Sequence, residues 1–218
     1  MGLLTQQLEA MLGPGMHIPD SIRLLFDRIE SQGTYIDQPS GARIGYLFPE
    51  AELKASWTDT ERAGGTIIWF AASGSSGLEY WFGHSDPAIL NRLCVFARTG
   101  AEGSMAAFWI DDEGGQKIVH LGSGSGSVLV CVLADVAIDF IRLLAIGYDE
   151  ICWKSEFHAP PNQTEFRVWP HKAFQEWVMQ TFHVTIPSTA SEIVRHPSEM
   201  GDERPLDEFA RWVNANTQ

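Results

Sequence analysis

The pattern of apolar residues changes twice along this chain, and these changes restrict the fold more than any other feature. Two helical segments are followed by short runs of β-type residues separated by turn residues, and helical spacing then returns. Helices before and after a block of strands are typical of the α+β class. We therefore predict a mainly antiparallel sheet packed against helices, in a single domain over 1–218. The expected parts are a helical N-terminus over about 1–32, a sheet over about 43–134 and helices over about 135–217.

The sheet region contains seven predicted strands. They are expected at 44–48, 66–71, 79–82, 93–97, 105–110, 117–121 and 128–133. Asp112-Glu113-Gly114-Gly115 between two of them is typical of a hairpin turn. We predict a loop over 31–40, because Gly33, Pro39 and polar residues interrupt the pattern there.

Five helices are predicted from apolar spacing, over 3–11, 19–29, 135–147, 171–182 and 205–214. The third is apolar over most of its circumference, so we expect it to pack centrally against the sheet. Asp135 is a candidate cap for its start, and Gly147 is expected to end it. The last carries Pro205 at its start and Asp207 and Glu208 in its first turn, where the helix dipole favours acids.

The charge of the chain restricts its partners. The 28 acidic and 15 basic residues give a formal charge of −13, while 44% hydrophobic and 20% charged residues are typical of a soluble globular protein. Negative charge opposes binding to phosphate backbones and anionic lipid, so we expect neither nucleic acid nor membrane as a partner. The same field attracts basic proteins and raises their association rate.

The chain is expected to be cytoplasmic. Its N-terminus has no signal-peptide pattern, and the most apolar region, 128–148, contains three charged residues. Cys94, Cys131 and Cys152 lie in apolar surroundings and form no C-x-x-C pair, which indicates buried, reduced, structural thiols.

No segment carries a strong catalytic or cofactor motif. The glycine-rich run 122–127 has G-x-G-x-G spacing and no following Lys, so it indicates a strand connection rather than a phosphate site. No G-x-S-x-G occurs, and no two of the seven histidines have zinc-binding helical spacing. The acids at 111–113 are typical of a solvated turn, and those at 149–150 of a solvated helix end. We predict no catalytic residue, no metal and no cofactor. An enzyme that uses His120 or Cys131 stays open as an alternative.

The tryptophans give the candidate contact residues. In the predicted strands Trp81 shares a face with Glu79, and Trp109 shares a face with Asp111, because residues two apart point the same way. An aromatic and acidic strip on an exposed sheet face would suit a basic protein partner. The alternative is that the rings lie in the core, because a shift of one residue in register would bury the strip.

Several segments resemble a known superfamily. They are FARTG at 96–100, AFWI at 107–110, IVHLGS at 118–123 and the run from VLAD at 132–135 to DFIRLLAIGY at 139–148. Together they resemble the SUKH superfamily, the Smi/Knr-like group of bacterial toxin-immunity proteins and fungal cell-wall regulators. The similarity covers mainly 92–150, with weaker similarity over 169–193. It implies an α+β domain that binds another protein and has no catalytic residues.

The resemblance and the charge lead to two hypotheses. The first is an immunity protein that occludes a basic, nuclease-like toxin domain in a one-to-one complex whose association slows as salt rises. The second is a regulatory or scaffold protein of the same fold with several weak partners.

Overall fold

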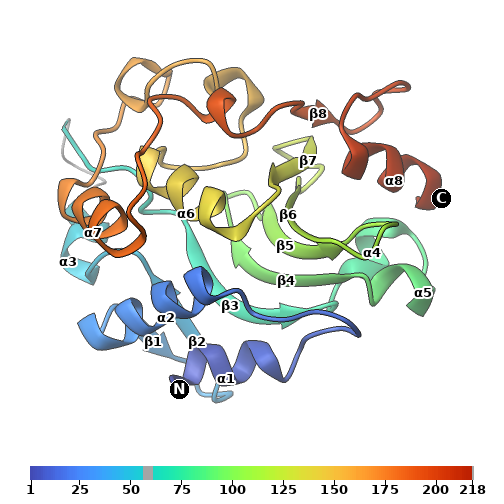
Figure 1. The fold of residues 1–218 in the computed structure, drawn as a ribbon, viewed down its shortest axis with the longest axis horizontal. Helices are drawn as coiled ribbons and strands as arrows, with labels where there is room; N and C mark the ends of the chain where they lie inside the picture. The colour runs from blue at the N-terminus through green and yellow to red at the C-terminus, as the bar shows by residue number, and fades with distance from the viewer. Residues whose placement is uncertain (56–60, 218) are drawn as a thin grey trace.

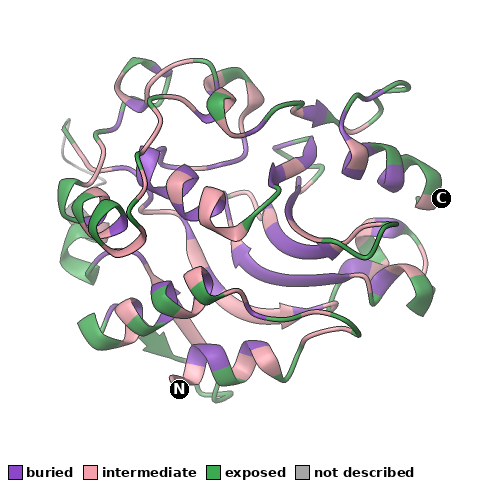
Figure 2. Cartoon of the chain, viewed as in Figure 1, coloured by how far each residue is buried: buried purple, intermediate pink, exposed green. Residues whose placement is uncertain are grey.

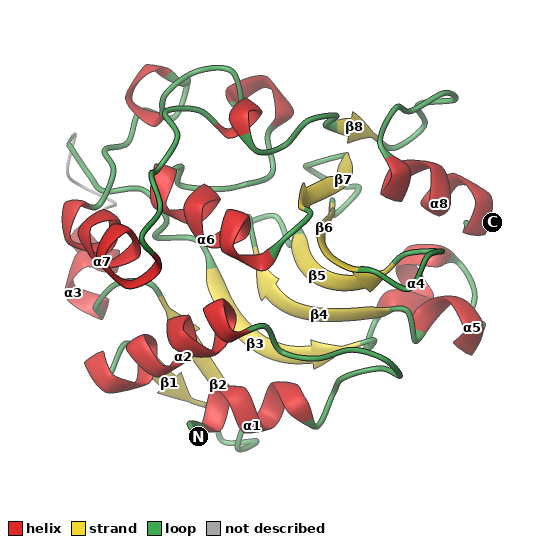
Figure 3. Cartoon of the chain, in the orientation of Figure 1, coloured by secondary structure: helices red, strands yellow, loops and turns green. Residues whose placement is uncertain are grey.

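One antiparallel sheet organises the chain. The computed structural model describes residues 1–55 and 61–217, and in this part eight strands pair in the order of the sequence (Figure 1, Figure 3). The strands are β1 (Tyr35–Asp37), β2 (Arg43–Tyr46), β3 (Trp69–Gly74), β4 (Leu93–Arg98), β5 (Met105–Ile110), β6 (Gln116–Leu121), β7 (Leu129–Ala134) and β8 (Ser198–Glu199). The predicted α+β class is confirmed.

Helices cover both faces of this sheet. The α-helices are α1 (Leu3–Glu9), α2 (Asp20–Gln32), α3 (Glu50–Ala55), α4 (Leu78–Phe82), α5 (Pro87–Leu90), α6 (Ala137–Ile146), α7 (Lys172–Phe182) and α8 (Glu208–Asn216). Three 3-10 turns are η1 (Lys154–Glu156), η2 (Pro161–Gln163) and η3 (Ala190–Glu192). α1 and α2 contact β2, α6 contacts β6 and β7, and α7 packs on α6 (Figure 1). The buried apolar residues form two cores. α8 contacts β7, and its apolar residues belong to the second of these cores, together with those of α4 and α5.

Burial on both faces explains why the central strands are apolar almost throughout. Successive side chains of a strand point to opposite faces. In β5, Phe108 belongs to the core on the α6 side, and its neighbour Trp109 belongs to the core on the α8 side. Figure 2 shows that the central strands of the sheet are largely buried. The two cores therefore share one sheet.

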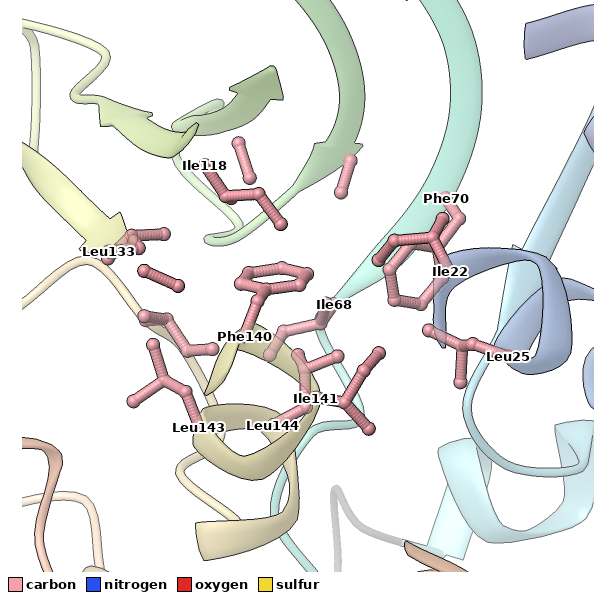
Figure 4. Close-up of a cluster of buried hydrophobic side chains, with 14 of the residues drawn as sticks. Ile22, Leu25, Ile68, Phe70, Ile118, Leu133, Phe140, Ile141, Leu143 and Leu144 are labelled. Atoms are coloured by element: carbon pink, nitrogen blue, oxygen red, sulfur yellow. The ribbon is translucent and has the colours of Figure 1, made fainter. Parts of the chain in front are cut away.

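Phe140 of α6 lies at the centre of the first core. Its ring lies among Ile118, Leu133 and Ile68 (Figure 4). Its ring meets that of Phe96 edge to face with the centroids 5.6 Å apart. Helix α6 ends at Gly147, as predicted, and this residue adopts a positive φ of 93° that favours glycine.

Asp207 joins α8 to the sheet. One carboxylate oxygen accepts the backbone N–H of Ala210 at 2.9 Å and caps the helix, and the other accepts the N–H of Val132 in β7 at 3.0 Å. Lys117 of β6 also donates to Glu208 in the first turn of α8. Two polar contacts thus fix the start of the helix that covers the second apolar face.

The predicted strand at 79–82 is wrong, because this segment forms α4. Gly77 and Gly83 flank it with positive φ values of 83° and 77°, which allow a short helix with a sharp turn at each end. Leu78 and Phe82 are then buried on one side of α4. Packing of this helical face outweighs the β propensity of the aromatic residues.

Several other predicted helices, strands and helix ends also differ from the structure. The segment 31–40, predicted as a loop, contains β1, and β8 lies outside the predicted sheet region. α3, α4 and α5 lie within that region. Asp135 does not cap α6: Val136 occupies the cap position without a side-chain bond, and Asp135 lies 3.5 Å from the Lys117 ammonium. Helix α8 begins at Glu208 rather than at Pro205.

We expect Phe140→Ala to lower the free energy of unfolding by about 3–5 kcal/mol, because it leaves a void in a core that is packed on every side. Val136→Ala, at the start of the same helix and 54% exposed, should change it by less than about 0.5 kcal/mol. Urea denaturation measures both variants. A Phe140→Ala effect no larger than that of Val136→Ala would contradict the central position of Phe140.

We expect Asp207→Ala to cost about 2–3 kcal/mol, because the helix cap and the partner of the Val132 N–H are lost together. The exposed Glu203, in the same segment, gives the control variant Glu203→Ala, which should be near neutral. Equal midpoints in urea for the two variants would show that Asp207 does not hold α8 on the sheet.

Candidate functional site

A groove of about 550 Å³ lies between α8 and the β5–β6 hairpin. We call it the α8 groove. One wall contains Arg92, Trp109, the turn residues 111–113 and Lys117, and the other contains Glu208, Arg211 and Trp212 of α8. Segments more than 90 residues apart in the sequence therefore meet at one site.

Two of the four predicted contact residues, Trp109 and Asp111, line this groove together. Trp109 is only 2% exposed, because Phe209 and Trp212 of α8 pack against its ring at centroid distances of 5.1 and 5.5 Å. Asp111 accepts N–H groups of the hairpin turn, including that of Gly115 at 2.7 Å. The predicted exposed strip is therefore wrong for Trp109, since α8 covers that face of the sheet.

The other two, Glu79 and Trp81, lie on α4 and do not line the α8 groove. Trp81 is half-buried, and its Nε1 donates to the carbonyl of Gly122 at 2.7 Å. It lines a second hollow, of about 360 Å³, together with Tyr80 and Arg98. The structure thus separates the four predicted residues into two places.

Lys117 is the centre of a carboxylate cluster in the α8 groove. Its ammonium donates to Glu208 and lies 3.6 Å from Asp111 and 3.5 Å from Asp135. Burial by itself would lower the pKa of Lys117, but the bond to Glu208 and the three negative charges outweigh burial and raise it. Three carboxylates face one cation, so this cluster keeps a net negative charge.

Arg92 is the second cation of the groove that is paired with a carboxylate. Its guanidinium pairs with Asp112 at 2.8 Å and donates to the Ile110 carbonyl at 2.8 Å. The guanidinium carbon lies 5.0 Å from the ring centre of Trp212 and 5.8 Å from that of Trp109, which are cation–π distances. The rim carboxylate Asp112 stays 79% exposed. Arg92, Glu208 and Trp212 were not predicted as site residues.

Two buried N–H groups of the α8 groove have no acceptor within the described residues. They are Nε1 of Trp109 and Nη2 of Arg92. Most buried donors in proteins are paired, and an unpaired one costs about 1–3 kcal/mol. Both nitrogen atoms are closed off from solvent, so neither water nor a ligand in the groove reaches them in this structure.

His120 is fully buried inside the sheet. The Leu129 carbonyl accepts from Nδ1 at 2.9 Å, so Nδ1 carries the proton and Nε2 accepts from the Thr99 hydroxyl at 3.0 Å. Burial lowers the pKa of His120 to about 4. Both ring nitrogens of His120 are thus used in hydrogen bonds within the chain.

The cysteines and the glycine-rich loop also have structural settings. All three thiols are free and buried, and burial raises the pKa of Cys131 well above its usual value and that of Cys94 to about 12. The segment 122–127 connects β6 to β7, and the Gly124 N–H donates to the Ser127 carbonyl at 2.9 Å. None of these features favours an enzyme that uses His120 or Cys131.

The fold and the groove define an α+β protein with an acidic cleft beside its last helix. Comparisons with protein-family models, with curated proteins and with solved structures find no match for this chain. The resemblance to the SUKH superfamily therefore stays a prediction. In the part that the structure describes, no helix is both long and apolar enough to cross a bilayer. The same part contains no group of three or more His, Cys, Asp or Glu residues arranged to hold a metal ion.

We expect acid to destabilise the protein through His120. Above about pH 6.5 the His120 ring is neutral in both the native and the unfolded protein. Below that pH the ring becomes protonated in the unfolded chain, whereas in the native protein it stays neutral because its pKa is about 4. The free energy of unfolding should fall by about 2 kcal/mol between pH 7.5 and 5 from this group alone. His120→Gln should remove that share of the pH dependence. Parallel pH profiles of the two proteins would contradict the buried, neutral ring.

Proposed function

We propose that this chain is a non-catalytic protein-binding module that neutralises a cognate toxin domain by occluding a basic, nuclease-like surface. The observation that carries the proposal is the excess of acid on the surface. Among the described residues sixteen acidic residues are exposed, against six basic ones. The exposed basic residues are Lys54, Arg167, Lys172, Arg195, Arg204 and Arg211.

Such a surface suits a basic partner for two reasons. A long-range negative field steers positively charged proteins and raises their association rate. Of the three cations that line the α8 groove, Arg211 is exposed and donates to the carbonyls of Pro205 and Leu206. The other two are already paired with carboxylates of the chain, Lys117 with three and Arg92 with Asp112. They therefore oppose a basic partner less than free cations would. The resemblance of 92–150 to the SUKH superfamily supports the same class of function.

A regulatory or scaffold protein with several weak partners is the second candidate. The second hollow, beside α4, favours it, because Tyr80 at its edge is 87% exposed and lies apart from the α8 groove. Two separate surfaces with aromatic residues would allow more than one partner.

The test is capture of partners by the tagged chain in its native cell, followed by kinetics with the partner obtained. We expect one dominant basic protein at equal stoichiometry, and an association rate that falls at least tenfold between 50 and 500 mM salt while dissociation changes little. Rescue of cells from that partner's toxicity would complete the assignment. An association rate independent of salt would contradict the electrostatic part, and several exchanging partners would favour the scaffold.

A further inference from the structure

The second hollow lies where the helices leave part of the sheet open. Trp69, Arg98 and Met105 lie opposite one another in β3, β4 and β5, so their side chains leave the same face of the sheet. It is the face of the second core, against which Met105 packs, but all three side chains are only partly buried. Arg98 and Met105 line the hollow together with Tyr80 and Trp81 of α4 and residues of the 122–127 loop.

Arg98 has no carboxylate partner within the residues that the structure describes. Its Nη1 donates to the Gly103 carbonyl at 3.0 Å, and its guanidinium carbon lies 5.9 Å from the ring centre of Trp69. Glu102 lines the same hollow, but its carboxylate accepts the N–H and the hydroxyl of Ser104 instead. Burial lowers the pKa of Arg98, as expected for a cation that loses water and gains no carboxylate.

The unpaired edge of this guanidinium is open to solvent. Nε and Nη2 of Arg98 share one edge, and neither has an acceptor in the described part of the chain. Unlike Nη2 of Arg92, neither belongs to the buried nitrogen atoms that lack a partner, so solvent reaches both. Such an edge is the fork that binds the two oxygens of a carboxylate. The contacts with Gly103 and Trp69 already hold the guanidinium, which lowers the entropic cost of pairing.

The side chains around Arg98 indicate a protein ligand. Tyr80 is 87% exposed, and the ring of Trp81 is held by its bond to the Gly122 carbonyl. Tyr, Trp, Met and Arg are the residue types enriched in protein interfaces, and the hollow contains one of each. The charge of Glu102 favours a carboxylate over a phosphate, because it repels a dianion about twice as strongly as a monoanion.

We propose that the second hollow binds an acidic side chain of the protein partner: the Nε–H and Nη2–H groups of Arg98 donate to its carboxylate, and the rings of Tyr80 and Trp81 contact the residues beside it. This inference rests on the proposed protein-binding function and adds a second surface with the opposite charge requirement.

One partner can cover this hollow and the α8 groove together. α4 lies against α8, where the ring centres of Phe82 and Trp212 are 5.7 Å apart. A partner that is basic overall can carry the single acidic residue that the hollow requires.

The probe for the test is the capped peptide Gly-Phe-Glu-Phe-Gly, titrated into the full-length ¹⁵N-labelled protein at low salt. Matched peptides carry Gln, Lys or phosphoserine in place of Glu. We expect a saturable shift of the Arg98 Nε–H signal with the Glu peptide, binding at least fivefold weaker with Gln or Lys, and weaker binding with phosphoserine than with Glu. Tighter binding of the phosphoserine peptide would overturn the preference for a carboxylate.

Arg98→Gln should weaken binding of the Glu peptide at least fivefold, followed by the backbone amide signals of Tyr80 and Ser125. Arg204→Gln is the matched control, because it removes one exposed positive charge outside the hollow and should leave the affinity unchanged. Tyr80→Ala removes an exposed ring, so it should leave folding intact and weaken binding at least threefold. A stationary Arg98 signal, or equal affinities of the Arg98→Gln and Arg204→Gln variants, would overturn the inference.

The captured partner separates this inference from the proposed function. A complex that Arg98→Gln weakens and Arg204→Gln does not would support both. A complex that both variants retain at full affinity would overturn the hollow as a contact with the partner and leave the protein-binding function intact.

Discussion

Burial of both faces of β4–β7 is the constraint on which the rest of the structure depends. Phe108 and Trp109 are neighbours in β5 but belong to different cores, so the sheet needs a cover on each side. α6 supplies one cover, and α8, fixed by Asp207, contributes to the other together with α4 and α5. Because α8 also forms a wall of the groove, the element that completes the core also shapes the candidate binding surface.

Local sequence predicted most of the fold. The strand at 105–110 and the end of α6 at Gly147 agree with the structure, since β-type residues and a glycine in a left-handed conformation act over a few residues. The failure at 79–82 arose because burial of one face of α4 outweighed strand propensity. The wholly apolar run at 93–97 already indicated a strand buried on both faces. That pattern argued against an exposed face for the neighbouring strand that contains Trp109.

The candidate site could be predicted only in part. Trp109 and Asp111 were found because residues two apart on a strand share a face, and both line the α8 groove. Arg92, Glu208 and Trp212 come from an earlier and a later segment, and no spacing in the sequence relates them to β5. Glu79 and Trp81 were assigned to the same strip because 79–82 was predicted to be a strand, but this segment forms α4. Local periodicity predicts faces of elements, whereas tertiary packing decides which faces meet.

Amide hydrogen exchange of the chain with and without its captured partner is the most direct test that binding uses the surface built by α8. The account predicts added protection at the hairpin turn 111–115 and along Glu208–Asn216, with little change in α1 and α2. Protection confined to α1, α2 or α6, with the hairpin and α8 exchanging as in the free protein, would contradict it.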